Sequence, residues 1–578
     1  MTTLIAPYGG TLINLMSVNP EALQQEALRL PSLDLNPETT ADLELLMSGA
    51  YSPLTGFMGR ADYESVLHRQ TLCNGTYWPL PVVFEIPAEK VELCKTAGTV
   101  ALRDAEGLLL ALMSVEEIWE ADALAEAELL GVAARADTRH YLGGRVQGVA
   151  YVPRHDFPEL RVTPAAVRSE LVGRGLSRVI ALQTRQPLTR AQYEFLIQTT
   201  ALHNASLLLH PMITATDSLT SADFFALVRG FQAVMPRFPK KMAMLAILAL
   251  PPRMASAREL GLRSIVARNF GVGKLIVGGT YQAEGHRRRG QDAAQLADEL
   301  RFKTGVELLL FPRMVYAPDA DRYIDEDQAS SDVHTRSVTG EEMDHHLRSG
   351  LPVAPWHVFP EVLNELLRSY PPRSRMGLTV FFTGLSGSGK STLARALASK
   401  LMEIGNRPVT LLDGDVVRKH LSSELGFSPE HRDINIRRIG YVASEITKHR
   451  GIAICAPIAP YAQSRLDVRA MVSAQGGFVE IYVATPLEVC EGRDRKGLYA
   501  RARAGLVKSF TGISDPYEVP KHPELVIDTT SISVEEGIER IVALLRKEGY
   551  LPDPQHAQEL ASEKLKTAAG HGVKHEAS

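Results

Sequence analysis

Cysteine is scarce in this sequence, which has only Cys73, Cys94, Cys455 and Cys490 among its 578 residues. The four lie far apart and form no CxxC pair, a pattern that argues against a disulfide framework and against a zinc site. Such usage is typical of proteins that stay in a reducing compartment. We therefore expect a cytoplasmic protein.

Long apolar runs and an excess of one charge are also missing. The longest apolar run, MAMLAILALPP at 242–252, has about half of the ~20 residues that a membrane helix needs, so we expect a buried strand there. The formal net charge is -4, too small for a field that draws the whole chain to nucleic acid or to a membrane. The opening MTTLIAPYGG has no basic region before an apolar core and does not resemble a secretory signal. Nucleic acid and membranes are therefore not expected as partners.

The composition that remains is that of a globular protein, 45% hydrophobic and 22% charged, in a chain long enough for about three or four domains. Short apolar runs between turn signals near the start predict a β-rich domain. Two later series of apolar strands alternate with helix-length segments, which predicts parallel sheets and a multidomain α/β fold. The predicted divisions are 1–160 (β-rich), 161–320 (first parallel sheet), 321–372 (a small third domain and linker), 373–550 (second parallel sheet) and 551–578 (a polar tail).

The most specific motif is GLSGSGKST at 384–392, which fits the phosphate-binding pattern G-x-x-x-x-G-K-[ST]. An apolar strand is expected before it and a helix after it, a context that argues against the alternative of a glycine-rich turn without a ligand. In this setting the glycines let backbone N–H groups surround phosphate oxygens, Lys390 reaches the terminal phosphates of ATP, and the hydroxyl of Ser391 ligates Mg²⁺. The predicted ATP-binding residues are Gly384, Ser386, Gly387, Ser388, Gly389, Lys390, Ser391 and Thr392.

Two carboxylates follow the next predicted strand, in VTLLDGDVVRKHL. Asp413 and Asp415 come at its carboxyl end beside the phosphate loop, where they can organise Mg²⁺ or accept a proton from a substrate hydroxyl. An acidic turn without chemistry is the alternative, because DGD alone is a weak signal. We predict catalytic roles for Lys390, Asp413 and Asp415, and metal binding by Ser391 and Asp413.

Basic segments that suit an anionic nucleotide come next in the chain. Arg432, Asn435 and Arg438 recur at i, i+3 and i+6, near one face of a predicted helix. A solvated charged face is the alternative for this stripe. The segment 493–518 is basic, interleaved with aromatic residues and punctuated by Gly and Pro, as expected of a mobile lid over phosphates.

Together these stretches resemble adenylylsulfate (APS) kinase over about 376–548. The resemblance is carried by six motifs that follow that family's order and spacing: GLSGSGKST, DGDxxR, LGFS, RxxNIRR, KGLYxxARAG and FTGIxDPYE. The resemblance implies phosphorylation of the 3′-hydroxyl of adenylyl sulfate, with ATP and Mg²⁺ as cofactors. It also implies that Phe427 and Phe510 are the aromatic faces that hold the substrate adenine. The residues that it places at the adenylyl sulfate are Asp415, Arg418, Phe427, Arg432, Asn435, Ile458, Lys496 and Phe510.

One position departs from the APS kinase pattern. The chain reads PIAPY at 457–461, and Ala459 stands where the family has a serine once proposed to carry a phosphoryl group. A phosphoserine intermediate is therefore impossible at this position. Direct in-line transfer, with Lys390, Mg²⁺ and cations of the lid stabilising the charge, needs no such residue.

The first 370 residues resemble ATP sulfurylase (sulfate adenylyltransferase) along their whole length, through stretches such as HPMI, ARELGLRSIVARNFG and APWHVFPEV. The resemblance implies a PUA-like β domain, an α/β nucleotide-binding domain and a small third domain. Two signatures are incomplete: this chain lacks both histidines of Q-[TF]-R-N-P-x-H-x-x-H and reads GGTY for G-R-D-H. The positions of this vestigial site are Gln183, Arg185, Thr189, Gln192, Gly279, Thr280 and Tyr281.

These differences bear on the sulfurylase reaction, in which sulfate attacks the α-phosphorus of ATP and pyrophosphate leaves. Imidazoles and an arginine aimed at the leaving group are electrostatic catalysts, and loss of one such donor costs about 10²–10³ in rate. Three imidazoles and one arginine are missing together here. We expect a sulfurylase-shaped domain with little or no sulfurylase activity, in which Arg185 can still bind an anion.

The leading hypothesis is therefore an APS kinase with a sulfurylase-like module that assembles or regulates it. One alternative is a true bifunctional enzyme that makes adenylyl sulfate and then phosphorylates it. Another is a P-loop kinase for a different nucleotide, against which the DGDxxR, RxxNIRR and KGLY stretches argue. The order of modules resembles that of fungal sulfurylases, which implies a homo-oligomer, with a hexamer expected and a dimer as the alternative.

Overall fold

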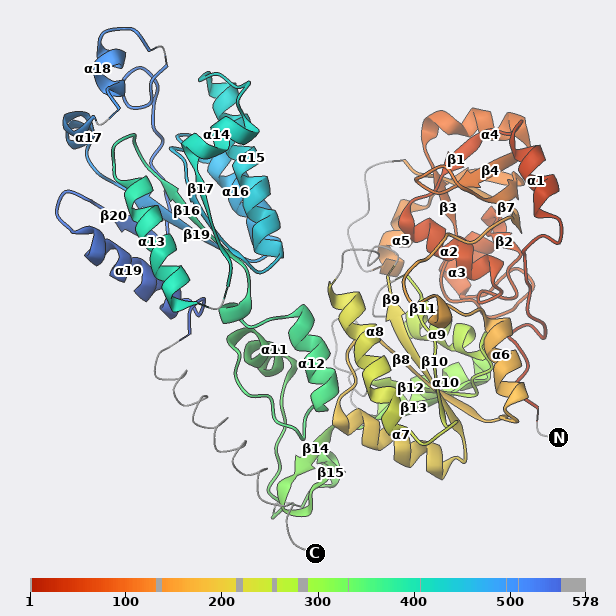
Figure 1. Cartoon of the computed structure of the whole chain (residues 1–578). Helices are drawn as coiled ribbons and strands as arrows, with labels where there is room; N and C mark the ends of the chain where they lie inside the picture. Colours follow the sequence, from red (N-terminus) through yellow and green to blue (C-terminus); the bar gives the residue numbers. More distant parts are fainter. Residues whose placement is uncertain are drawn as a thin grey trace, which may run out of the picture. The chain divides into compact units, whose positions relative to one another are not determined.

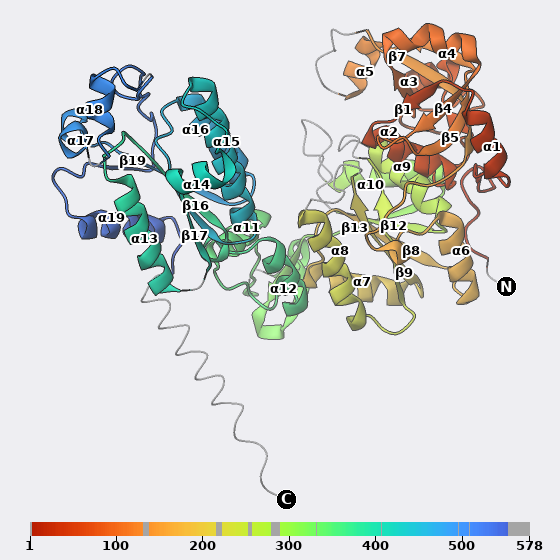
Figure 2. The same cartoon turned by 45° about the horizontal axis from the view of Figure 1, so that its top comes forward.

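The chain divides into two compact units, residues 1–339 with 353–369 and residues 340–352 with 370–578 (Figures 1 and 2). No described helix combines the length and the apolarity of a membrane span. The structure is a computed structural model that describes residues 3–130, 138–214, 222–251, 257–278, 290–330, 332–405, 407–494, 496–507 and 509–552.

A seven-stranded sheet forms the N-terminal part of the first unit. Its longest strand, β7 (His140–Gly148), pairs antiparallel with β2 (Gly56–Phe57), β3 (Phe84–Ile86), β5 (Leu109–Ser114) and β6 (Glu117–Glu120). Strand β5 is buried along nearly its whole length, which explains its unbroken apolar sequence. The other elements are β1 (Ser32–Asp34), β4 (Thr99–Arg103), α1 (Pro20–Ala27), α2 (Pro37–Met47), α3 (Arg60–Arg69), α4 (Val91–Ala97) and α5 (Ala123–Leu130).

A parallel sheet with the strand order β10-β9-β8-β12-β13 follows in the first unit, with β11 paired to β9. Strand β9 is buried at every position, as expected of a parallel strand covered on both faces. The predicted alternation of strands and helices is therefore confirmed. The elements are β8 (Val179–Thr184), β9 (Ser206–Ile213), β10 (Ala243–Leu245), β11 (Leu248–Ala249), β12 (Lys274–Gly278), β13 (Glu307–Phe311), α6 (Pro164–Gly173), α7 (Arg190–Leu202), α8 (Ala222–Val234), α9 (Ala257–Asn269) and α10 (Gly290–Thr304).

The first unit is completed by the antiparallel hairpin of β14 (Met314–Ala317) and β15 (Arg322–Asp325) and by α12 (Pro360–Ser369). Tyr316 of the hairpin stacks on Trp356, with ring centroids 5.1 Å apart and planes 3° from parallel. Helix α12 packs on α8, where Arg229 Nε donates to Glu365 at 2.7 Å. The division of the chain at residues 160, 320 and 372 stays a prediction.

The second unit is built on a five-stranded parallel sheet with the order β17-β18-β16-β19-β20. One apolar core lies between the sheet and α13 and α19, and another lies between the sheet and α14, α15 and α16, so both faces are covered (Figure 1). The elements are β16 (Leu378–Thr383), β17 (Val409–Asp413), β18 (Ile452–Ala456), β19 (Gly477–Val483), β20 (Leu525–Ile527), α11 (Gly340–Ser349), α13 (Lys390–Ile404), α14 (Gly414–Leu421), α15 (Pro429–Lys448), α16 (Ala462–Ser473), α17 (Leu487–Arg493), α18 (Leu498–Arg503) and α19 (Val534–Lys547).

Candidate active site

The glycine loop of residues 384–389 joins the carboxyl end of β16 to the first residue of α13. Gly384, Gly387 and Gly389 have φ angles of 146°, 76° and 102°, a region that side-chain-bearing residues rarely adopt. A Cβ on Gly384 would lie 2.5 Å from the carbonyl oxygen of Val483, so glycine is also required by space. Within the described part of the chain, no side chain caps α13. The loop and the helix N-terminus therefore offer backbone N–H groups to an anion, as the sequence predicts.

Lys390, the first residue of α13, has 6% of its surface exposed. Its Nζ donates to the carbonyl oxygen of Leu385 at 2.6 Å and lies 3.5 Å from the Ser388 Oγ. Burial lowers the pKa of Lys390 to about 8, helped by the positive charge of Lys496, while the carboxylate of Asp413 acts in the opposite direction. The lysine is thus held over the loop by oxygen acceptors whose place a phosphate oxygen can take.

This lowered pKa predicts a pH dependence of ATP capture. Below about pH 8 the free protein carries a charged Lys390, and above it the lysine becomes neutral, so kcat/KM for ATP should fall as the pH rises through about 8. Bound phosphates favour the charged lysine, so kcat at saturating ATP should persist to higher pH. Steady-state kinetics across this range test the prediction, and a kcat/KM for ATP that stays constant between about pH 7 and pH 9 would contradict it.

Asp413 lies at the carboxyl end of β17, and β18 separates β17 from β16 in the sheet. Because these strands are parallel, their carboxyl ends meet at one edge, which places Asp413 near the phosphate loop. Its side chain is buried, and Arg395 Nη2 lies 3.5 Å from its Oδ2. Asp415 follows in the first turn of α14, at the same edge of the sheet. The structure therefore brings Asp413 and Asp415 to the same end of the sheet as Lys390 and Ser391. The catalytic and metal-binding roles of these residues stay predictions.

Helix α15 carries two of the predicted substrate-binding residues. Arg432 Nη1 donates to the Asp515 Oδ2 at 2.6 Å and to the Thr511 Oγ1 at 2.7 Å. Asn435 is buried, and its Oδ1 has no hydrogen-bond donor among the described residues. Arg438 is more exposed and donates to Glu424 at 2.6 Å. The predicted stripe is therefore divided: Arg432 and Asn435 face inward, and Arg438 lies on the solvated side.

The two aromatic residues predicted at the adenine differ in exposure. Phe427 is 62% exposed, and the guanidinium of Arg418 lies over its ring at 4.5 Å from the centroid. Phe510 is only 8% exposed and meets Tyr499 edge to face, with centroids 5.0 Å apart. Phe427 thus presents a ring face that a base can stack on, while Phe510 is covered within the predicted lid. The adenine contact of both rings stays a prediction, as does the contact of Lys496 with adenylyl sulfate.

The loop before α16 contains Ile458 and Ala459, and its carbonyl groups are held by other elements. Thr383 Oγ1 donates to the Ile458 oxygen at 2.8 Å, and Arg465 Nη1 donates to the Ala459 oxygen at 2.7 Å. Ala459 has a φ of 46° and is 1% exposed. Its methyl group belongs to the core between the sheet, α15 and α16.

We expect that Ala459→Ser raises the kinase rate by no more than a few-fold, since in-line transfer needs no hydroxyl there and the position is enclosed. Turnover and trapping of a radiolabelled phosphoenzyme test this, with Ala470→Ser on the exposed side of α16 as the control. A chase-competent phosphoenzyme with a large gain in rate would count against direct transfer.

In the first unit, the vestigial sulfurylase positions at the end of β8 are tied to the fold. The carbonyl oxygen of Gln183 accepts from Arg263 Nη2 at 2.7 Å, and Arg185 Nη2 donates to the Leu250 oxygen at 3.1 Å. Thr189 and Gln192 form the capping box of α7: the Thr189 Oγ1 accepts from the Gln192 N–H at 3.2 Å, and the Gln192 Oε1 accepts from the Thr189 N–H at 3.0 Å. These side chains therefore stabilise the start of α7. The positions Gly279, Thr280 and Tyr281 lie outside the described residues.

His210 on β9 is a residue beside this site that the sequence reasoning did not single out. It pairs in register with Gln183 and is fully buried, with its ring edge to face with Phe270 at 4.7 Å. Neither ring nitrogen has a hydrogen-bond partner among the described residues. Burial lowers the pKa of His210 to about 3, so the imidazole is neutral. The HPMI stretch, which begins with His210, is the sequence signal that could have pointed to this residue.

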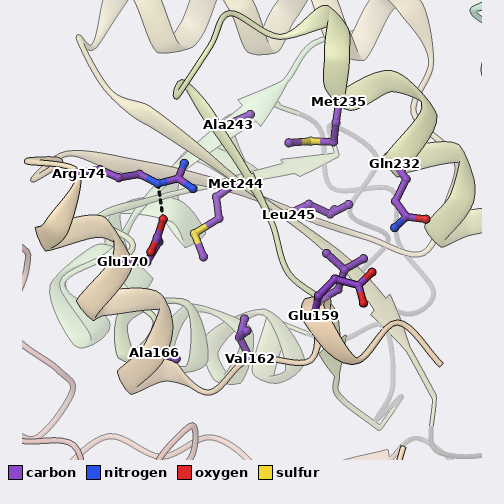
Figure 3. A pocket seen from close by; sticks show the side chains of 11 residues that line it. Glu159, Val162, Ala166, Glu170, Arg174, Gln232, Met235, Ala243, Met244 and Leu245 are labelled. Carbon is purple, nitrogen blue, oxygen red and sulfur yellow. Dashed lines mark hydrogen bonds and ion pairs between the residues drawn. The ribbon is translucent and has the colours of Figure 1, made fainter. Parts of the chain in front are cut away.

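A cavity of about 650 Å³ lies elsewhere in the first unit, between α6, the end of α8 and the edge strand β10 (Figure 3). Met235, Met244 and Leu245 give it an apolar lining, and Arg174 Nε donates to Glu170 at 2.7 Å on one side. None of the predicted site residues lines it.

A glycine loop with a buried lysine, at the carboxyl edge of a parallel sheet, defines the second unit as a P-loop kinase. Family models agree: adenylylsulphate kinase matches residues 376–528, ATP-sulfurylase matches 158–369 and a PUA-like domain matches 5–140. The sulfate adenylyltransferase of Phaeosphaeria nodorum is 38% identical, and that of Chaetomium globosum is 39% identical, each over 94% of this chain and 99% of the relative. The chain therefore belongs to the sulfate adenylyltransferase family, in the form that also carries an adenylylsulphate kinase domain.

A solved structure described as a hexameric APS kinase from Thiobacillus denitrificans is similar over both units. It is 46% identical, with a TM-score of 0.80, and the match covers 95% of this chain and 100% of that chain. The predicted combination of a PUA-like domain, a sulfurylase-type domain and a P-loop kinase domain with a parallel sheet is confirmed.

Proposed function

We propose that this protein is an adenylylsulfate kinase that transfers the terminal phosphoryl group of ATP to the 3′-hydroxyl of adenylyl sulfate, giving ADP and 3′-phosphoadenylyl sulfate in sulfate assimilation. The observation that carries the proposal is the complete phosphate loop with its buried Lys390, inside the region that matches the adenylylsulphate kinase model. A charged Lys390 aimed at the terminal phosphate stabilises the charge that is shared between the attacking and leaving oxygens.

The carboxyl edge of the sheet supplies the remaining groups. Ser391 and Asp413 offer a hydroxyl and a carboxylate oxygen, the donor type that Mg²⁺ prefers. Among the described residues no group of three or more His, Cys, Asp or Glu side chains could hold a metal alone, so the nucleotide phosphates would complete the coordination. When bound, Mg²⁺ neutralises charge on the phosphates. Asp415 is proposed to accept the proton of the 3′-hydroxyl.

The substrate is proposed to lie across α14, α15 and the lid. Phe427 offers a stacking face for the adenine, and Asn435, with an acceptor that no described residue satisfies, suits an amino group of the base. Arg432 and Lys496 supply positive charge for the phosphosulfate. Arg418, Ile458 and Phe510 complete the proposed adenylyl sulfate site.

Identification of the product tests the proposal. The purified protein should form ADP from ATP and Mg²⁺ only when adenylyl sulfate is present, and mass spectrometry with phosphorus NMR should place the new phosphate on the 3′-oxygen. Adenosine 5′-phosphate, which lacks the sulfate, serves as the control acceptor. Equal phosphorylation of both acceptors would point to a P-loop kinase of broader specificity.

For the first unit, we propose a sulfurylase-like module without appreciable sulfurylase activity, which assembles or regulates the kinase. The capping box of Thr189 and Gln192 supports this, because their side chains stabilise a helix start and carry no positive charge for a leaving pyrophosphate. Gln183 and Arg185 remain as polar groups at the end of β8, where Arg185 can contact an anion.

A bifunctional sulfate adenylyltransferase and adenylylsulfate kinase is the second candidate. The names of relatives that are 38% and 39% identical over 94% of this chain favour it. Pyrophosphate-dependent ATP synthesis separates the two candidates.

We also propose a cytoplasmic homo-oligomer without nucleic-acid or membrane partners. The hexameric state given for the Thiobacillus denitrificans protein supports a hexamer, and a dimer is the alternative. Sedimentation equilibrium of the full chain, with a protomer of 63.3 kDa, distinguishes them.

A further inference from the structure

The segment of residues 509–518, here called the clamp segment, contacts Arg432 at several points. Arg432 Nη1 donates to the Thr511 Oγ1 at 2.7 Å and to the Asp515 Oδ2 at 2.6 Å, and Nη2 donates to the carbonyl oxygen of Ser509. The Arg432 and Asp515 side chains are only 11% and 12% exposed. The arginine is therefore held by one short stretch of chain that lies about 80 residues away in sequence.

Asp515 holds a second group in addition to Arg432. The hydroxyl of Tyr461 donates to the same Oδ2 at 2.8 Å. Burial and the neighbouring carboxylate raise the pKa of Tyr461 to about 12, so the hydroxyl remains a donor at neutral pH. One carboxylate oxygen thus joins α15, the loop before α16 and the clamp segment.

The clamp segment is also fixed on the C-terminal side of Asp515. Tyr517 shares a hydrogen bond of 2.8 Å with Thr383, the last residue of β16 before the phosphate loop. The Glu518 Oε2 accepts from the N–H of Ala462 at 2.6 Å, and the Glu518 oxygen accepts from Arg465 Nη2 at 2.7 Å. These contacts set the position of Asp515 relative to the phosphate loop.

We propose that Asp515 is a positioning residue that orients Arg432 toward the anionic end of adenylyl sulfate; this rests on the proposed kinase function. Without the carboxylate, the long arginine side chain would have several accessible rotamers, and its charge would be less well aligned with the substrate. The contacts with Ser509, Thr511 and Asp515 fix the guanidinium in one orientation, from which it can offer positive charge to an anionic ligand. Asp515 acts through Arg432 and touches no reacting atom in this account.

The first test is steady-state kinetics of Asp515→Asn, which keeps the shape of the side chain and removes its charge. The KM for adenylyl sulfate should rise by about tenfold to a hundredfold, whereas the KM for ATP should change by less than about two-fold. Asp515→Glu restores the carboxylate and should recover part of the loss. Asp467→Asn is the matched control. Asp467 lies on α16 and pairs at 2.9 Å with Arg437, which is on the exposed side of α15, the helix that carries Arg432.

A double-mutant cycle with Arg432→Ala tests whether Asp515 acts through Arg432. If it does, the double variant loses no more kcat/KM for adenylyl sulfate than Arg432→Ala alone. Additive losses, or equal increases in both KM values, would assign Asp515 a general structural role and overturn the proposal. Tyr461→Phe keeps the charge pair and should cause a smaller rise in the same KM, which keeps the proposal testable if Asp515→Asn unfolds.

The outcomes also separate this inference from the proposed function. If the unmodified protein forms no ADP in response to adenylyl sulfate, the proposed kinase function is overturned. Normal activity in the unmodified protein, with an unchanged KM for adenylyl sulfate in folded Asp515→Asn, would overturn the role of Asp515 alone.

Discussion

Lys390→Ala should lower the kcat for phosphorylation of adenylyl sulfate by about 10³ or more, while the protein remains folded. The ammonium group is the buried cation within the glycine loop, where its pKa of about 8 leaves it charged at neutral pH. Its charge acts on the oxygens of the transferred phosphoryl group, and a methyl group cannot replace it. The loss should appear in kcat as well as in kcat/KM, because the interaction is strongest in the transition state.

Lys400→Ala provides the matched control for this variant. Lys400 lies on the same helix but is exposed, with its Nζ 2.8 Å from the Glu403 Oε2. It should retain near-normal turnover, because an exposed ion pair contributes little and lies outside the phosphate loop. Thermal unfolding should show both variants folded. Near-normal phosphorylation of adenylyl sulfate by folded Lys390→Ala would refute the role given to this lysine.

The second large effect concerns the first unit. The unmodified protein should make no detectable ATP from adenylyl sulfate and pyrophosphate, because the positions that should bear imidazoles carry Thr189, Gln192 and Tyr281. Electrostatic catalysis requires several donors that converge on one developing charge. At the start of α7, Thr189 and Gln192 carry no positive charge and are engaged with each other's backbone N–H groups.

Restoring two histidines, with Thr189→His and Gln192→His, should not recover the activity. The imidazoles would share a helix face, but the GGTY stretch would still lack the arginine and the third histidine. The loss of the capping box should also lower the stability of the helix start by about 1 kcal/mol. Rescue should need rebuilding of the second loop as well, with Gly279→Arg, Thr280→Asp and Tyr281→His.

Thr163→His is the stability control, because Thr163 caps α6 and accepts from the Ala166 N–H at 3.3 Å, outside the vestigial site. It should show a comparable loss of thermal stability. Robust ATP synthesis by the unmodified protein, or full rescue by the two histidines alone, would show that other residues carry the charge.

The fold and the phosphate loop could be predicted because their signals are local. A glycine loop between an apolar strand and a helix fixes its own geometry, and parallel strands buried on both faces read as apolar runs. The capping box was also readable, since a threonine followed three residues later by glutamine is a helix-start signature. Above, Thr189 and Gln192 are considered only as replacements for two histidines of the family signature.

The remaining features depend on tertiary contacts that spacing does not reveal. The pairing of Arg432 with Asp515 joins residues 83 positions apart, and the covering of Phe510 by Tyr499 depends on how the predicted lid folds. A spacing of six residues already places Arg432 and Arg438 about 120° apart around α15, and the packing of α15 decides that Arg432 is the buried one. His210 is equally hidden, because its neutrality follows from burial.

The most direct test of the account is a paired assay of one preparation of the full-length protein, with pyrophosphate release from ATP and sulfate measured beside ADP formation from ATP and adenylyl sulfate. We predict ADP formation that depends on adenylyl sulfate and is lost in Lys390→Ala, with no pyrophosphate release above background. Pyrophosphate release at a rate comparable to that of ADP formation would instead show a bifunctional enzyme and would contradict the assignment of the first unit as a catalytically impaired module.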